Sequence, residues 1–256
     1  MDLNIVNNQE KFLAGKLEGY TLKGAENKFD DRGNPLPFPG CTIICNIPLN
    51  TNLSDQIISL QKNIENFNPE KTYFYLPPSS FHMTLFDCCN FNTKNTNYWP
   101  SDIDPDMDYK DIAVELNKRI QNYIFPKEFN LKLKMFFGGY SIILEPYSEK
   151  DEKILRNCRD ELSSLLKIKF ENHQRYTFHI TLAYILRELN QIEINNLIEF
   201  NKKLSLDFSK KFPKITFTKP EMCIFEDMLE FKSINPSSLL LFLLLNILQA
   251  PKLHPL

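Results

Sequence analysis

The sequence predicts an α+β fold of two similar lobes, each an antiparallel sheet with outer helices, arranged around a central cleft. Two related segments lie far apart in the chain, FHMTL at 81–85 and FHITL at 178–182. Apolar residues at alternate positions in both segments indicate strands with one buried face. Each of these strands follows a predicted strand and helix of its own half, so we expect an approximate twofold relation with both histidine strands facing the cleft.

The first half is predicted to begin after an irregular stretch, residues 1–39, which ends in a segment rich in Pro and Gly. An apolar strand over 41–47 follows, and apolar residues at helical spacing then predict a helix over 53–67. A strand over 72–76 and the turn PPSS lead into the first histidine strand.

A long loop over 87–110 separates the halves. It is rich in Asn, Asp and Pro and contains Trp99, the only tryptophan. Loops of this length often act as lids or binding segments, and a solvated excursion is the alternative. A helix over 109–124 follows, and then strands over 131–137 and 141–145 joined by a Gly-Gly hairpin turn.

The rest of the second half starts with a helix capped by Ser148, with Asp151 three residues on as in a capping box. Most charged residues of that helix are expected to face solvent, including Arg156, Arg159 and Asp160. His173 precedes the second histidine strand and is interpreted as structural or surface-exposed. A helix over 191–204 and strands over 215–218 and 222–225 complete the fold.

We expect three parts along the chain: an N-terminal extension over 1–27, the two-lobed domain over 28–235 and a leucine-rich tail over 236–256. The leucine run is shorter than the roughly 20 residues that span a bilayer. A buried terminal helix is therefore the preferred interpretation of the tail, and membrane association is the alternative. The first residues lack the apolar core of a signal peptide, so we expect a cytoplasmic protein.

Composition excludes several classes of function. A net charge of −2 argues against a protein that coats nucleic acid by electrostatics alone. The seven glycines form neither a G-x-G-x-x-G pattern nor a Walker-type loop, so a glycine-rich phosphate cradle is not expected. Six cysteines without a C-x-x-C pair indicate reduced core thiols rather than a disulfide scaffold or a zinc site.

The two histidine strands carry the residues that phosphodiester chemistry requires. His82 and Thr84 share one face of the first strand, and His179 and Thr181 share one face of the second. Cleaving a phosphodiester needs a base for the attacking group and an acid for the leaving oxygen, and histidine serves either role near neutral pH. Threonine hydroxyls can donate to the non-bridging phosphate oxygens. The alternative is a pair of core histidines satisfied by hydrogen bonds.

Paired His-x-Thr motifs of this kind resemble the two-histidine (2H) phosphoesterase superfamily. That superfamily includes cyclic phosphodiesterases, bacterial RNA ligase-like enzymes and nucleotide-binding domains of kinase-anchoring proteins. Further segments resemble an uncharacterised subfamily known only as a domain of unknown function, and the resemblance covers about 28–232. These segments are FPG at 38–40, PPSSFHMT at 77–84, WP at 99–100, RDEL at 159–162, RYTFHITLAY at 175–184 and FEDM at 225–228.

The resemblance implies a metal-independent phosphodiesterase without cofactor, acting on a cyclic phosphate or a 2′-5′ or 3′-5′ phosphodiester of a nucleotide or RNA end. His82 and His179 would be the acid and base, in either order, and Thr84 and Thr181 would hold the phosphate. Strand parity places Arg175 and Thr177 on the same face as His179, with Arg175 either in the site or at its rim. The candidate substrate-binding residues are Arg175, Thr177, Ser80 and Tyr184.

Two other functions remain open. A nucleotide-binding module without turnover would keep the threonines but would not need both imidazoles. A His-ligated metallohydrolase would need a third ligand, and no H-x-H or H-E-x-x-H spacing occurs. We expect a monomer that acts on a nucleotide or RNA end and does not bind membranes.

Overall fold

A computed structural model describes residues 3–19, 27–30, 32–67 and 72–234. The leucine-rich tail predicted over 236–256 lies outside the described residues. None of the helices in the described ranges combines the length and the apolar character that crossing a membrane requires.

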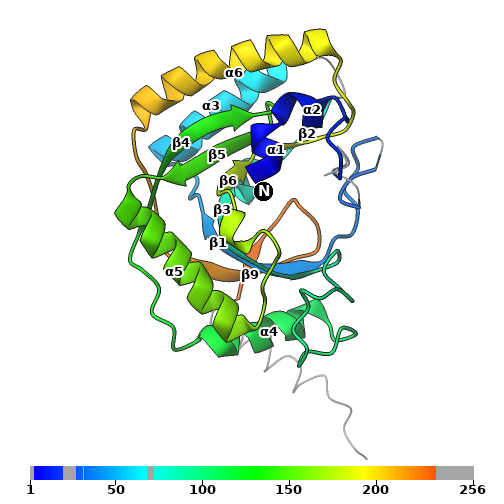
Figure 1. The fold of residues 1–256 in the computed structure, drawn as a ribbon, viewed down its shortest axis with the longest axis vertical. Coiled ribbons are helices and arrows are strands. Elements are labelled where there is room, and N and C mark those ends of the chain that lie inside the picture. Colours follow the sequence, from blue (N-terminus) through cyan, green and yellow to red (C-terminus); the bar gives the residue numbers. More distant parts are fainter. Residues whose placement is uncertain (1–2, 20–26, 31, 68–71, 235–256) are drawn as a thin grey trace, which may run out of the picture.

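An eight-stranded sheet, antiparallel throughout, forms the centre of the molecule (Figure 1). In sheet order its strands are β10 (Lys232–Ser233), β9 (Glu221–Phe225), β1 (Gly40–Asn46), β3 (His82–Asn90), β6 (His179–Thr181), β5 (Ser141–Pro146), β4 (Phe129–Phe137) and β8 (Ile215–Phe217). The predicted α+β class with antiparallel strands is confirmed. The two halves of the sheet are continuous, because the histidine strands β3 and β6 pair directly at its centre.

Within the described ranges, four long helices lie outside the sheet: α3 (Asn52–Phe67), α4 (Tyr109–Ile120), α5 (Glu149–Leu166) and α6 (Gln191–Lys211). In Figure 1, α3 and α6 lie side by side at one end of the molecule, where the rings of Phe67 and Phe200 stack with centroids 4.0 Å apart. Helices α4 and α5 contact each other at the opposite end. All four helices were predicted, and α6 extends beyond the predicted end at 204 because its apolar face continues to the buried Phe208.

The second histidine strand is interrupted in the structure. After β6, the chain leaves the large sheet, and β7 (Ala183–Ile185) pairs with β2 (Tyr73–Tyr75) in a small sheet of their own. The buried amide of Gln61 stabilises this transition, since its Nε2 donates to the carbonyl oxygens of both Leu76 and Leu182 at 2.8 Å. One side chain of α3 thereby joins the segments that follow β2 and β6.

The N-terminal segment is not irregular throughout, so that part of the prediction over 1–39 is wrong. Residues 3–13 form two short helices, α1 (Leu3–Asn7) and α2 (Gln9–Leu13). Their side chains join a second apolar cluster, in which Phe12 contacts Phe137 with ring centroids 5.8 Å apart. These helices were missed because each has about one turn, too short to show helical periodicity.

Two predicted local features are confirmed. Gly138 and Gly139 form the hairpin turn between β4 and β5 with φ values of 56° and 69°, in the left-handed region that glycine enters without strain. Ser148 caps α5, with its Oγ accepting from the Asp151 N–H at 3.2 Å. All six cysteines are buried and free of disulfides.

The loop between β3 and α4 carries part of its own packing. Trp99 is half-buried, its Nε1–H donates to the Ile103 carbonyl at 2.9 Å, and its ring meets that of Tyr109 edge-on. Ile103 is buried in the main core. The loop is therefore anchored to the molecule rather than a fully solvated excursion.

Arg159 is buried, and the expectation that it faces solvent is wrong. Its guanidinium Nη1 donates to the Leu85 carbonyl at 2.6 Å, and its Cζ lies 4.0 Å from the centre of the Tyr176 ring. The periodicity of α5 places Arg159 beside the buried Cys158 and Leu162, on the face that packs on the sheet. An arginine can occupy such a position when its charge meets a carbonyl oxygen and an aromatic face.

Strand β3 contains two bulges. Ile44 of β1 pairs with Thr84 but Ile43 pairs with Phe86, so Leu85 is an extra residue, and a second irregularity precedes Asn90. A bulge shifts the alternation of side chains by one residue. Thr84 and Asp87 therefore lie on the same face of β3, which a regular strand does not allow.

We expect Arg159→Met to destabilise the protein by about 2–4 kcal/mol, because the bulged Leu85 carbonyl loses a charged donor in a buried setting. Urea unfolding followed by circular dichroism measures this. Lys153→Met, on the exposed face of the same helix, is the control and should change stability by less than about 0.5 kcal/mol. Equal stabilities of the two variants would contradict a structural role for Arg159.

Candidate active site

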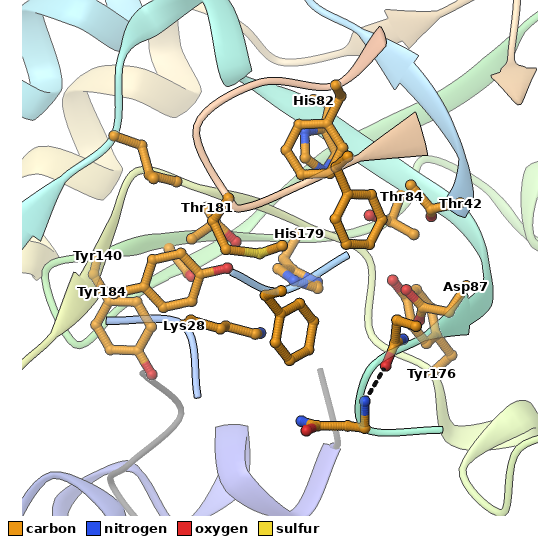
Figure 2. A pocket seen from close by; sticks show the side chains of 18 of the residues that line it. Lys28, Thr42, His82, Thr84, Asp87, Tyr140, Tyr176, His179, Thr181 and Tyr184 are labelled. Carbon is orange, nitrogen blue, oxygen red and sulfur yellow. Dashed lines mark hydrogen bonds between the residues drawn. The ribbon is translucent and has the colours of Figure 1, made fainter. Parts of the chain in front are cut away.

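A cavity of about 490 Å³ lies over the centre of the large sheet. Both His-Thr pairs contribute to its lining, His82 and Thr84 from β3 and His179 and Thr181 from β6 (Figure 2). The two segments that dominate the sequence pattern are thus brought together at one site.

The pairing of β3 with β6 fixes how the four side chains face one another. These strands run antiparallel with Met83 opposite Ile180, and both of these residues are fully buried on the other face of the sheet. This register sets His82 opposite Thr181 and Thr84 opposite His179. Cross-strand neighbours on one face have Cβ atoms about 4.5–5.5 Å apart. Each imidazole therefore has the hydroxyl of the other strand beside it.

The backbone orients both imidazoles in the same way. Nδ1 of His82 lies 2.7 Å from the Ser80 carbonyl oxygen, and Nδ1 of His179 lies 3.0 Å from the Thr177 carbonyl oxygen. A carbonyl oxygen only accepts, so in each ring Nδ1 carries the proton. Nε2 is then the basic nitrogen of the neutral ring in both cases.

Burial keeps both rings neutral at pH 7 in the free protein. It lowers the pKa of His82 to about 4, with the Ser80 hydrogen bond opposing the shift. Burial likewise holds the pKa of His179 well below its usual value, and the neighbouring His82 adds to the effect. A bound phosphate would favour the imidazolium form, because an adjacent anion raises the pKa of histidine.

The four residues predicted to bind substrate have different positions. Tyr184 lines the cavity. Ser80 and Thr177 are buried outside the lining, and each contributes the backbone carbonyl that orients a histidine. Arg175 is exposed and not among the lining residues. The parity prediction for Arg175 and Thr177 is wrong because residues 173–175 form a 3-10 turn and β6 begins only at His179.

His173 is structural, as interpreted from the sequence. It is 2% exposed, and its Nε2 lies 2.8 Å from Asp160 Oδ1. Its ring also meets that of Phe86 edge-on. The contact joins the turn before β6 to α5.

Sequence reasoning missed several lining residues. Lys28 precedes β1, and its Nζ lies 5.1 Å from the ring centres of both Phe38 and Tyr184. Asp87 reaches the cavity through the bulge in β3. Other polar residues that line the cavity and were not predicted from the sequence include Thr42, Tyr140, Ser141 and Tyr176. Ser141 pairs with Thr181 of β6. A sequence argument that placed the hairpin strand beside the second histidine strand would therefore have identified Ser141 as a neighbour of the site.

Tyr176 connects the cavity to the buried Arg159. Burial raises the pKa of its hydroxyl, and the Asp87 carboxylate adds to the shift, whereas a hydrogen bond with Thr84 opposes it. The guanidinium of Arg159 covers one face of the Tyr176 ring. Tyr176 is therefore a neutral hydroxyl held next to Thr84.

The described part of the chain contains no group of three or more His, Cys, Asp or Glu side chains arranged to hold a metal ion.

Comparisons with known proteins give a family-model match over part of the chain and a shared fold. Residues 28–139 match the family model 2H-phosphodiest, described as a domain of unknown function (DUF1868), which confirms the resemblance inferred from the sequence. The chain is also similar to the crystal structure of a conserved protein of unknown function from Agrobacterium tumefaciens str. C58. That match has 20% identity and a TM-score of 0.82, and covers 89% of this chain and 97% of the other. The fold is therefore shared with that protein.

Weaker structural matches include a phosphoesterase, with 10% identity and a TM-score of 0.45 over 78% of this chain and 96% of the other. Escherichia coli LigT, crystallised with NADP+, matches with 12% identity and a TM-score of 0.42 over 77% of this chain and 96% of the other. Among proteins with curated descriptions, no significant match to the sequence was found.

Acidification is expected to destabilise the protein partly through His82. The unfolded ring takes up a proton near pH 6.5 and the folded ring only near pH 4, so stability that is present above pH 6.5 is lost as the pH falls between these values. From pH 7 to pH 5 the loss attributable to His82 is at most about 2 kcal/mol. Urea unfolding at both pH values should show a smaller loss for His82→Gln than for the wild type, whereas equal losses would contradict a depressed pKa.

Proposed function

We propose that the protein is a metal-independent phosphodiesterase that cleaves a cyclic phosphate or a 2′-5′ or 3′-5′ phosphodiester of a nucleotide or RNA end. The observation that carries this proposal is the placement of two His-Thr pairs opposite each other across β3 and β6, on the face of the sheet that lines the cavity. In this proposal the two halves of the sheet act as the two lobes, residues 28–235 form the catalytic domain, and the protein acts as a cytoplasmic monomer.

The geometry supplies each component of an in-line displacement. One neutral imidazole accepts a proton at Nε2 from the attacking hydroxyl or water, and the other, as imidazolium, donates a proton to the leaving oxygen. That imidazolium takes its proton from solvent, and the bound anionic phosphate stabilises it, because an adjacent anion raises the pKa of histidine. The Thr84 and Thr181 hydroxyls donate to the non-bridging oxygens, where negative charge increases in the transition state.

The cavity has the size and the side chains for a nucleotide. Its volume of about 490 Å³ lies within the usual range for small-ligand sites. Aromatic rings that can stack on a base are among its lining residues, including Phe38, Phe225, Phe231 and Tyr184. Of its described lining residues only Lys28 is a permanent cation, which suits a short substrate rather than a long polyanionic strand.

One observation favours the alternative, a nucleotide-binding module without turnover. Both histidines are neutral at pH 7 in the free protein, so neither is ready to act as an acid before a ligand binds. A screen of the purified protein against 2′,3′-cyclic nucleotides and short 2′-5′ and 3′-5′ oligonucleotides distinguishes the two functions. Product formation supports the enzyme, and saturable binding without product supports the module.

Replacing either cavity histidine should abolish most turnover. We expect His82→Ala and His179→Ala each to reduce kcat by roughly 10²–10⁴-fold on the best substrate, the usual contribution of a positioned acid or base. Substrate affinity should change far less, because the threonines are the main phosphate donors. His173→Gln is the control, since that ring is buried away from the cavity, and it should preserve kcat per folded molecule. Near-normal turnover by either alanine variant would contradict the paired mechanism.

Chelation should leave the activity intact. Two imidazoles and two hydroxyls supply the proton transfers and the charge stabilisation without a Lewis acid. Initial rates measured before and after dialysis against excess EDTA should agree. Loss of turnover with recovery on adding a single divalent ion would support the metallohydrolase instead.

A further inference from the structure

Lys28 brings to the cavity a full positive charge that the two His-Thr pairs do not require. Apart from the histidines, it is the only basic side chain among the described lining residues. The phosphate of a diester carries one negative charge, and in the proposed mechanism two threonine hydroxyls and one imidazolium already meet that charge. The ammonium group of Lys28 is therefore available for another part of the ligand.

The chain turns back on itself directly after Lys28 and so fixes the backbone of this residue. The Leu36 N–H donates to the Lys28 carbonyl oxygen at 2.8 Å. The Asp30 carboxylate closes the turn by accepting from both the backbone N–H and the side-chain amide of Asn34, each at 2.8 Å. These hydrogen bonds hold the pKa of Asp30 below its usual value, so the turn stays closed at neutral pH.

This turn is packed on the small two-stranded sheet. Phe29 is buried, and its ring centroid lies 4.4 Å from that of Phe74 and 5.0 Å from that of Tyr184. Phe74 belongs to β2 and Tyr184 to β7, and the two residues pair with each other. The place of Lys28 at the cavity is therefore set by its neighbour in sequence and by the paired strands β2 and β7.

Two aromatic rings hold the ammonium group of Lys28. Its Nζ lies 5.1 Å from the ring centroids of both Phe38 and Tyr184, within the range of cation–π attraction. Aromatic faces attract a cation without neutralising it, and Lys28 makes no ion pair with any described residue. Figure 2 shows Lys28 on the His179 side of the cavity. A fixed, uncompensated positive charge thus faces this part of the cavity.

The carboxylate of Asp87 gives the cavity a negative charge at a different place. Figure 2 shows Asp87 beside Tyr176 and away from Lys28. An anionic group of a ligand is repelled by the carboxylate and attracted by the ammonium group. The two charges therefore define one end of the cavity, that of Lys28, as the place for an additional anion.

We propose that Lys28 binds a second phosphate of the ligand, so that the protein selects nucleotides that carry one phosphate besides the one between the His-Thr pairs. This inference rests on the proposed phosphodiesterase function and names its substrate class. The simplest such substrate is a nucleoside 2′,3′-cyclic phosphate with a 5′-phosphate. Because the described lining offers only one lysine and no arginine, a single phosphate is selected rather than a polyphosphate chain.

A binding experiment tests the proposal without turnover. Calorimetry at low ionic strength compares adenosine 3′-monophosphate with adenosine 3′,5′-bisphosphate. The wild type should bind the bisphosphate about tenfold more tightly, because a charge-assisted contact with Lys28 is added. Lys28→Gln should reduce this preference to less than about twofold, whereas Lys28→Arg, which keeps the cation and its stacking, should retain it. Lys150→Gln, on the exposed side of α5, is the matched control and should retain it too.

Equal affinities of the wild type for the two nucleotides would overturn the proposal, as would an unchanged preference in Lys28→Gln. Circular dichroism and the thermal midpoint of each variant show that the comparison is made on folded protein.

A kinetic experiment separates the second phosphate from the cleaved one. The substrates are adenosine 2′,3′-cyclic phosphate with and without a 5′-phosphate. Lys28→Gln should lower kcat/KM about tenfold for the 5′-phosphorylated substrate and less than twofold for the other. Equal losses on both substrates would mean that Lys28 contacts the cleaved phosphate, and the proposal would be wrong. If the wild type cleaves neither substrate, the proposed phosphodiesterase function fails, while the calorimetric preference still decides whether Lys28 binds a second phosphate.

Discussion

The pairing of Met83 with Ile180 is the contact on which the arrangement of the candidate site depends. It joins the two halves of the large sheet, and it is the single residue pair between β3 and β6 in the part of the chain that the structure describes. A shift of one residue would turn His82 and Thr84 toward the core and bury them under the helices. Because Met83 and Ile180 are fully buried, such a shift would also expose two large apolar side chains. Core burial and site geometry are therefore enforced by the same two residues.

The bulge in β3 serves a different purpose from the pairing. It leaves the His-Thr spacing intact over 82–84 and changes the alternation only beyond it, so that Asp87 joins the cavity face. Arg159 satisfies the carbonyl of the extra residue and at the same time covers Tyr176. A single buried side chain of α5 thereby supports both the shape of the strand and the polar wall beside Thr84.

Local sequence patterns predict much of the fold. The helical periodicity of 53–67, the Gly-Gly turn and the Ser148 cap all involve neighbours in sequence, and the structure has each of them. The histidine strands were readable for the same reason. Asp87 and Lys28 were not, because a bulge is decided by tertiary contacts such as that of Arg159, and Lys28 reaches the cavity from a segment without periodicity. Arg175 was misplaced because parity was extended beyond the start of β6, into a 3-10 turn.

The short N-terminal helices have a practical consequence for anyone who trims the protein. Ile5 of α1 and Phe12 of α2 are part of the cavity wall, and Gln9 accepts a hydrogen bond from the Gly138 N–H at 2.7 Å. The family match begins only at residue 28, so a gene fragment designed on that boundary would encode a protein with one side of its cavity missing. Phe137 and Leu197, which pack in the same cluster as Phe12, would lose apolar cover. A crystallographer should therefore place a purification tag with a cleavable linker ahead of Met1 rather than shorten the chain to the family boundary.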